Sequence, residues 1–110
     1  MSFITSWSEG SYQDINSGSS QTVDFNELGF GTARLDLSGT GGAVTLTLSN
    51  PLEGGLYILG FHDVGVGVNV TFPSTVKNIA GTALGLVNLL LDSTMIMVFN
   101  GTDYIVVKSL

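Results

Sequence analysis

An alternation of apolar and polar residues with a period of two recurs along the chain. Residues 44–49 read VTLTLS, and residues 66–72 read VGVNVTF. The same period appears at 22–26 and 33–37, whereas no long stretch keeps the 3.6-residue period of an amphipathic helix. The pattern therefore predicts an all-β chain.

Residues typical of turns separate these apolar runs. Asp63–Gly65 is expected to form a hairpin turn between two strands. Pro73 should end a strand, because proline cannot donate a ladder hydrogen bond. Asn100–Asp103 predicts the turn of a C-terminal hairpin, because Asn-Gly accepts the positive φ angles of tight turns. Residues 84–92, LGLVNLLLD, fit a short helix or a strand, and their neighbours favour a strand.

The number and spacing of the runs predict an antiparallel β-sandwich or a small barrel of about seven to eight strands. These strands would form a single β-sandwich domain over residues 20–110. Residues 1–19 are polar, with isolated aromatic and aliphatic residues, and predict an extended N-terminal arm. The alternative for this segment is a first strand together with a flexible terminus.

Charge is scarce in this chain. Of its 110 residues, 3 are Lys or Arg and 9 are Asp or Glu, while 44% are hydrophobic. These 12 charges are too few to cover the surface of a single domain of this size. Either the 23 Ser and Thr and 7 Asn residues make up the polar surface, or part of the surface lies in an oligomer, and we expect both. The net charge of −6 argues against nucleic acid and anionic membranes as partners, because both are bound through clustered basic residues.

Two runs, GLYILGF at 55–61 and MIMVF at 95–99, are apolar on both faces of the expected strands. Such strands either lie at the centre of a single subunit or form an interface between subunits. Both readings stay open on sequence grounds. If there is an interface, its expected residues are Tyr57, Leu59, Phe61, Met95, Met97 and Phe99.

Catalytic and metal-binding patterns are weak. His62 is the sole histidine, and its neighbour Asp63 should point to the opposite face of a strand. Asp24 and Asp36 are the acids that could approach each other across a strand pair, but no calcium-loop motif surrounds them. The glycines at 39–42 read as turn residues, without the helix or lysine of a phosphate loop. We therefore expect no enzyme activity, no metal and no cofactor.

The aromatic residues allow two readings. Trp7, Tyr12 and Tyr104 could offer a platform for a glycan. Alternatively, Phe3, Trp7 and Tyr12 could anchor the arm to another protein, since aromatic residues are enriched at protein interfaces. The second interpretation is favoured for Trp7 and Tyr12.

Three segments carry a resemblance to a known family: LTLSNPLEGGLYIL at 46–59, VNVTFPSTVKNIAGTA at 68–83 and LDSTMIMVFNGTDYIVV at 91–107. In this order they resemble the small β-rich modules of tailed-phage fibres and related virion appendages. The resemblance extends over residues 20–110. Asn78-Ile79 departs from it, because family members often have Trp-Pro at this place.

The resemblance implies a non-enzymatic virion structural protein, usually a homotrimer, located on the surface of the phage particle. With only a short arm before the module, the expected role is a capsid decoration protein or a head or neck appendage. The arm would attach it to the major capsid protein or to another virion protein. The alternative is the receptor-binding tip of a tail fibre, with a host surface glycan as ligand.

Overall fold

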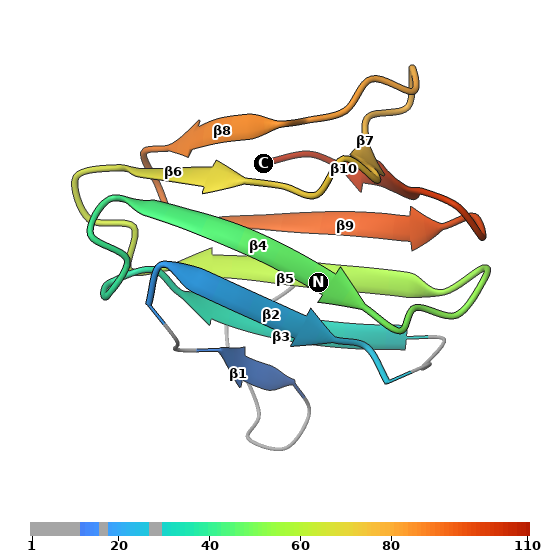
Figure 1. The fold of residues 1–110 in the computed structure, drawn as a ribbon, viewed down its shortest axis with the longest axis horizontal. Coiled ribbons are helices and arrows are strands. Elements are labelled where there is room, and N and C mark those ends of the chain that lie inside the picture. Colours follow the sequence, from blue (N-terminus) through green and yellow to red (C-terminus); the bar gives the residue numbers. More distant parts are fainter. Residues whose placement is uncertain (1–11, 16–17, 27–29) are drawn as a thin grey trace.

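The computed structural model describes residues 12–15, 18–26 and 30–110, and within them the chain is all β (Figure 1). The described residues contain no helix, so none could span a membrane. The strands are β1 (Gln13–Ile15), β2 (Ser20–Asp24), β3 (Phe30–Asp36), β4 (Ala43–Ser49), β5 (Leu56–His62), β6 (Val68–Thr71), β7 (Val76–Lys77), β8 (Leu86–Leu89), β9 (Ser93–Phe99) and β10 (Tyr104–Lys108). The all-β prediction is confirmed.

The strands form two sheets that enclose one core. The six-stranded sheet has the order β1-β3-β5-β9-β10-β7, and the four-stranded sheet has the order β2-β4-β6-β8. From β1 to β6 the chain alternates between the two sheets, so that strands within one sheet run parallel. The pairs β1–β2, β3–β4 and β5–β6 are successive turns of a solenoid-like coil, with the four-stranded sheet in front in Figure 1.

This connectivity corrects the expectation of an antiparallel sandwich or barrel. The turn that begins at Asp63 does not form a hairpin: it carries the chain from β5 in one sheet to β6 in the other. Asp63 and Gly65 have positive φ angles of 57° and 66°. Alternation in the sequence identifies a strand and its two faces but says nothing of its partner strand.

The last part of the chain adds antiparallel strand pairs to the coil, while the short β7 pairs in parallel with β10. β8 pairs with β6, β9 pairs with β5, and β10 pairs with β9. The expected C-terminal hairpin is confirmed, because the amide N–H of Asn100 donates to the carbonyl oxygen of Asp103 at 3.0 Å. The ambiguous segment 84–92 contains the strand β8, and β6 ends just before Pro73, as expected.

An aromatic cluster packs at the centre of the core between the sheets. The ring of Tyr57 stacks on Phe25 with centroids 4.0 Å apart. The ring of Tyr104 packs edge-on against Tyr57 and lies at a tilt of 51° to Phe25. The hydroxyl of Tyr57 accepts a hydrogen bond from the amide of Leu52 at 2.8 Å. The ring of Tyr57 is therefore held on its face and at its tip.

The expected interface side chains also point into this core. Tyr57, Leu59, Phe61, Met95 and Met97 are at most 2% exposed, and Phe99 is half-buried. The four-stranded sheet of the same subunit covers the five buried side chains, so these are not available to a second subunit, whereas Phe99 is only partly covered. The strands are nevertheless apolar on both faces, because Leu56, Ile58, Ile96 and Val98 occupy the alternate positions on the outer face.

Candidate docking groove at the end of the solenoid

The edge strands β7 and β8 lie at the same end of the molecule, where the two sheets stop (Figure 1). Three apolar side chains that pack against the core, Leu84, Val87 and Leu110, remain half-buried at or near this end. Solenoid proteins usually close their ends with polar capping elements. Here the end of the core is only partly covered.

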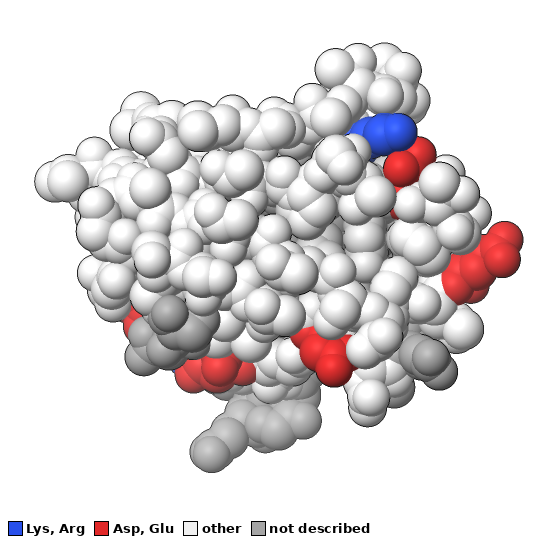
Figure 2. Space-filling model, viewed as in Figure 1, with Lys and Arg blue, Asp and Glu red and all other residues white. Residues whose placement is uncertain are grey.

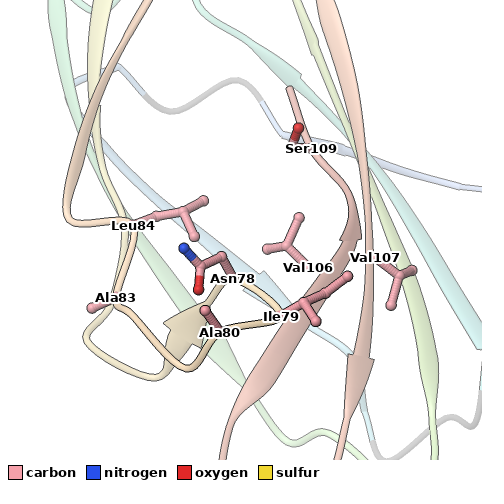
Figure 3. A pocket seen from close by; sticks show the side chains of 8 residues that line it. All are labelled: Asn78, Ile79, Ala80, Ala83, Leu84, Val106, Val107 and Ser109. Atoms are coloured by element: carbon pink, nitrogen blue, oxygen red, sulfur yellow. The ribbon is translucent and has the colours of Figure 1, made fainter.

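A groove of about 610 Å³ opens at this end between the loop after β7 and the strand β10 (Figure 3). Its lining is mostly apolar and contains no charged side chain. Ile79 and Val107 are the large side chains that it exposes to solvent, at 78% and 51%. The lining residues are Asn78, Ile79, Ala80, Ala83, Leu84, Val106, Val107 and Ser109.

The loop that forms one wall of the groove is held by its own hydrogen bonds. The amide of Gly81 donates to the carbonyl oxygen of Asn78 at 2.9 Å, and the amide of Thr82 donates to the side-chain oxygen of Asn78 at 3.0 Å. After the loop, the amide of Leu84 donates to the carbonyl oxygen of Val76 in β7 at 3.0 Å. Ile79 therefore projects from a supported turn.

Few charges lie near the groove. Lys77, just before the loop, forms an ion pair with Asp103 at 3.1 Å. Over the four-stranded sheet the surface is almost free of acidic and basic groups, and acidic groups gather along the edge nearest β2 (Figure 2). The exposed residues of β4 on this face are uncharged: Ala43, Thr45 and Thr47. The surface therefore suits contacts made by apolar and neutral polar groups.

Of the three residues expected to anchor the arm, the structure describes only Tyr12. Phe3 and Trp7 lie outside the described residues. Tyr12 is half-buried, and its ring lies 5.1 Å from the guanidinium carbon of Arg34. Tyr12 therefore lies on the outer face of the six-stranded sheet, beside β3.

Tyr104 cannot serve as a glycan platform. Its side chain is only 3% exposed and packs in the aromatic cluster of the core. Burial, together with the nearby Tyr57, raises the pKa of its hydroxyl to about 12. The sequence places Tyr104 just after an Asn-Gly turn, and this position gave no sign that its side chain is buried.

A second cluster brings together Asp36, His62 and Asp63, whose potential ligand atoms lie within 4.8 Å of one another. Nδ1 of His62 is 3.2 Å from a carboxylate oxygen of Asp63. The expectation that neighbours on a strand point apart was wrong here. Asp63 follows the end of β5, and its positive φ turns its side chain back toward His62.

This cluster lacks the support that a metal centre needs. Hydrogen bonds from Ser38, and the nearby His62, lower the pKa of Asp36. However, Nε2 of His62 is buried and finds no hydrogen-bond partner among the described residues. A histidine that ligates a metal through one nitrogen normally donates its other N–H to an acceptor. Asp24 does not join the cluster and instead accepts a hydrogen bond from Asn50 at 3.0 Å.

Comparison of the chain with protein-family models, with curated proteins and with solved structures finds no match. The resemblance to virion appendage modules therefore rests on the three sequence segments alone.

Proposed function

We propose that this protein is a non-enzymatic structural component of a phage particle that self-associates as a homotrimer. In this proposal it decorates the capsid, or forms part of a head or neck appendage, by binding the major capsid protein or another virion protein. The observation that carries the proposal is the apolar groove at the partly covered end of the solenoid. The resemblance of residues 20–110 to virion appendage modules supports the same role.

The groove favours association because its apolar side chains lie in water in a single subunit. Burying a side chain such as Ile79 or Val107 fully would contribute about 1.5–3 kcal/mol, and part of this gain offsets the entropy lost on association. Ile79 projects beside a hollow that could receive the same residue of another copy. A projection and a hollow on one subunit allow head-to-tail contacts, which close into a ring when the rotation is suitable.

The self-association is tested by sedimentation velocity at micromolar concentration. We expect the wild-type protein to sediment at three times its monomer mass of 11.5 kDa. Ile79→Asp and Val107→Asp should shift it toward the monomer, because a buried carboxylate without a partner is unfavourable. Val66→Asp is the control, since Val66 is fully exposed in the turn between β5 and β6 and does not line the groove.

A wild-type protein that stays a compact monomer would contradict the proposed trimer.

The role in the virion is tested separately, by electron microscopy of phage particles with an antibody against this chain. Label on the capsid, neck or tail supports the role, and intact particles that never carry label contradict it.

The glycan-binding tip receives no support from the described side chains. Sugar sites use exposed aromatic rings, and every described aromatic side chain is buried or half-buried.

A further inference from the structure

The strand β8 forms one edge of the four-stranded sheet, and it lacks the features that usually protect such an edge. Edge strands of soluble proteins often carry a charge, a proline or a bulge, which prevents pairing with another chain. Among the described edge strands, β1 contains Asp14, β2 contains Asp24 and β7 contains Lys77. β8 reads Leu-Val-Asn-Leu and pairs with β6 without a register shift. It is the one edge of the two described sheets without a charge.

Hydrogen bonds of β6 show which backbone groups of β8 face outward. The amide of Asn69 donates to the carbonyl oxygen of Gly42, on the β4 side of β6, at 2.9 Å. Asn69 lies opposite Asn88, and opposite residues of an antiparallel pair exchange both hydrogen bonds or neither. The backbone N–H and C=O of Asn88 therefore point away from β6. Because these groups alternate along a strand, those of Leu86 and Leu90 point the same way.

Two leucines flank Asn88 on the outer face of the sheet. Leu86 is 62% exposed, and Leu90, just after β8, is 65% exposed. A Cβ atom at Gly67 would lie 3.3 Å from Cδ2 of Leu90 and 3.9 Å from Nδ2 of Asn88. Leu90 therefore continues the row that Leu86 and Asn88 begin. This row has the same residue type on either side of Asn88.

We propose that β8 pairs antiparallel with β8 of a second copy, about a two-fold axis at Asn88. In this register Asn88 lies opposite its own counterpart, and Leu86 lies opposite Leu90 of the other copy. Between them, Val87 lies opposite Leu89. Every pair is then asparagine with asparagine or apolar with apolar, and the outward-facing backbone groups are the ones that exchange hydrogen bonds.

The charge of the chain favours a copy of itself as the occupant only at an uncharged site such as this one. A two-fold contact brings the same surface of both copies together, so each charge there would face its own sign. The chain carries a net charge of −6. The surface over β8 shows no acidic or basic group in Figure 2. This edge can therefore meet its own copy without repulsion between charged side chains.

The contact is small and separate from the groove. Pairing over residues 86–90 buries far less than the ~1,200 Å² of a stable interface. We therefore expect it to form at high local concentration and to leave the mass in micromolar solution unchanged. Residues 86–90 do not line the groove. The proposal thus goes beyond the homotrimer and adds a two-fold contact that can join one trimer to another.

A single cysteine tests the pairing, because the chain contains none. Mild oxidation of Asn88→Cys at submillimolar concentration should give a disulfide-linked dimer on a non-reducing denaturing gel. Cα atoms of a hydrogen-bonded antiparallel pair lie about 5.5 Å apart, which a disulfide can span.

Asn69→Cys is the matched control, since the side chains of Asn69 and Asn88 hydrogen-bond to each other at 2.7 Å and both variants lose this bond. The two copies of residue 69 would lie three strand spacings apart, about 14 Å, and should cross-link little. Equal cross-linking of both variants, or none in Asn88→Cys, would overturn the proposal.

A second substitution in the Asn88→Cys chain separates this contact from the groove. Leu86→Lys should reduce the cross-linked fraction several-fold, because lysine on an edge strand disfavours pairing. Leu52→Lys should leave it unchanged, since Leu52 is an exposed leucine in the turn between β4 and β5.

Ile79→Asp should also leave the cross-linked fraction unchanged. Its loss in that variant, or equal effects of Leu86→Lys and Leu52→Lys, would overturn the β8 contact without touching the trimer. A monomer in sedimentation with the cross-link retained would contradict the trimer alone.

Discussion

At the scale of single residues, the core depends on how tightly Tyr57 is held. Its ring stacks on Phe25, and its hydroxyl accepts a hydrogen bond from the amide of Leu52. The ring also folds back over Gly55, so that a Cβ atom at Gly55 would lie within 2.7 Å of ring atom Cε2. Because the ring is fixed on several sides, it cannot move away from an added methyl group.

Gly55→Ala should therefore destabilise the protein by about 1–3 kcal/mol, the usual cost of overpacking. Gly39→Ala is the control, because a Cβ atom there meets nothing within 4 Å and its effect should stay within about ±0.5 kcal/mol. Urea unfolding of both variants measures the difference. Equal stability of the two variants would show that the ring of Tyr57 can shift.

Because the hydroxyl of Tyr104 is buried, the folded protein should become less stable at alkaline pH. Burial raises its pKa from 10.0 to about 12 in the folded protein. The folded state then holds this proton more tightly than the unfolded state does. The stabilisation is complete below pH 10 and is lost as the pH rises toward about 12, by at most ~2–3 kcal/mol.

Tyr104→Phe should remove this part of the pH dependence, because phenylalanine has no ionisable hydroxyl. Urea unfolding at neutral pH and near pH 11 measures it. The wild type should lose more stability between the two conditions than the variant. An equal loss in both proteins would exclude Tyr104 as the source.

At the scale of elements, turn chemistry decides where strands stop but not which strands they pair with. The turn after β9 carries its own hydrogen bonds: the side-chain oxygen of Asn100 accepts from the amides of Thr102 and Asp103, at 3.0 and 2.8 Å. Gly101 has a positive φ of 98°, which glycine adopts without strain. These contacts lie within four residues, so the sequence was sufficient to predict this hairpin.

Asn100→Ala should destabilise the hairpin by about 1 kcal/mol, because two backbone amides lose their acceptor at an exposed site where water partly replaces it. Thr102→Ala is the control in the same turn, since only its backbone amide, and not its side chain, hydrogen-bonds to another described residue. Hydrogen exchange of the β9 and β10 amides would detect the loss. Faster exchange in Thr102→Ala than in Asn100→Ala would contradict the assignment.

At the scale of the whole molecule, apolar surface lies at the end of the solenoid and charge is sparse. The groove contains no charged lining residue, and the nearby Lys77 is paired with Asp103. An assembly formed through this groove would depend on apolar burial and would work against the repulsion between copies of net charge −6. Salt screens such repulsion.

Raising the salt concentration should therefore leave the self-association unchanged or strengthen it. Sedimentation equilibrium at low and high salt measures the dissociation constant. An association that weakens as salt rises would mean that ion pairs hold the copies together, and the groove would no longer explain the contact.

The alternating residues of 44–49 and 66–72, the stop at Pro73 and the turn at Asn100 were sufficient to predict strands and an all-β fold, because these signals act over a few residues. The tertiary structure alone decided that consecutive strands enter different sheets and run parallel within each sheet. It also decided which alternate positions of each strand face the core. In β5, Tyr57 faces the core between the two sheets, and Ile58 faces the outer side of the six-stranded sheet.

The groove was equally invisible in the sequence, where Ile79 stood out only as a departure from a family pattern. Its walls come from the loop 78–84 and from β10, which lie beside each other because β7 pairs with β10. Local patterns determine the conformation of a segment, since they act through the backbone and its nearest side chains. Partners and faces depend on contacts between residues far apart in the chain, and only folding the whole chain around one core selects them.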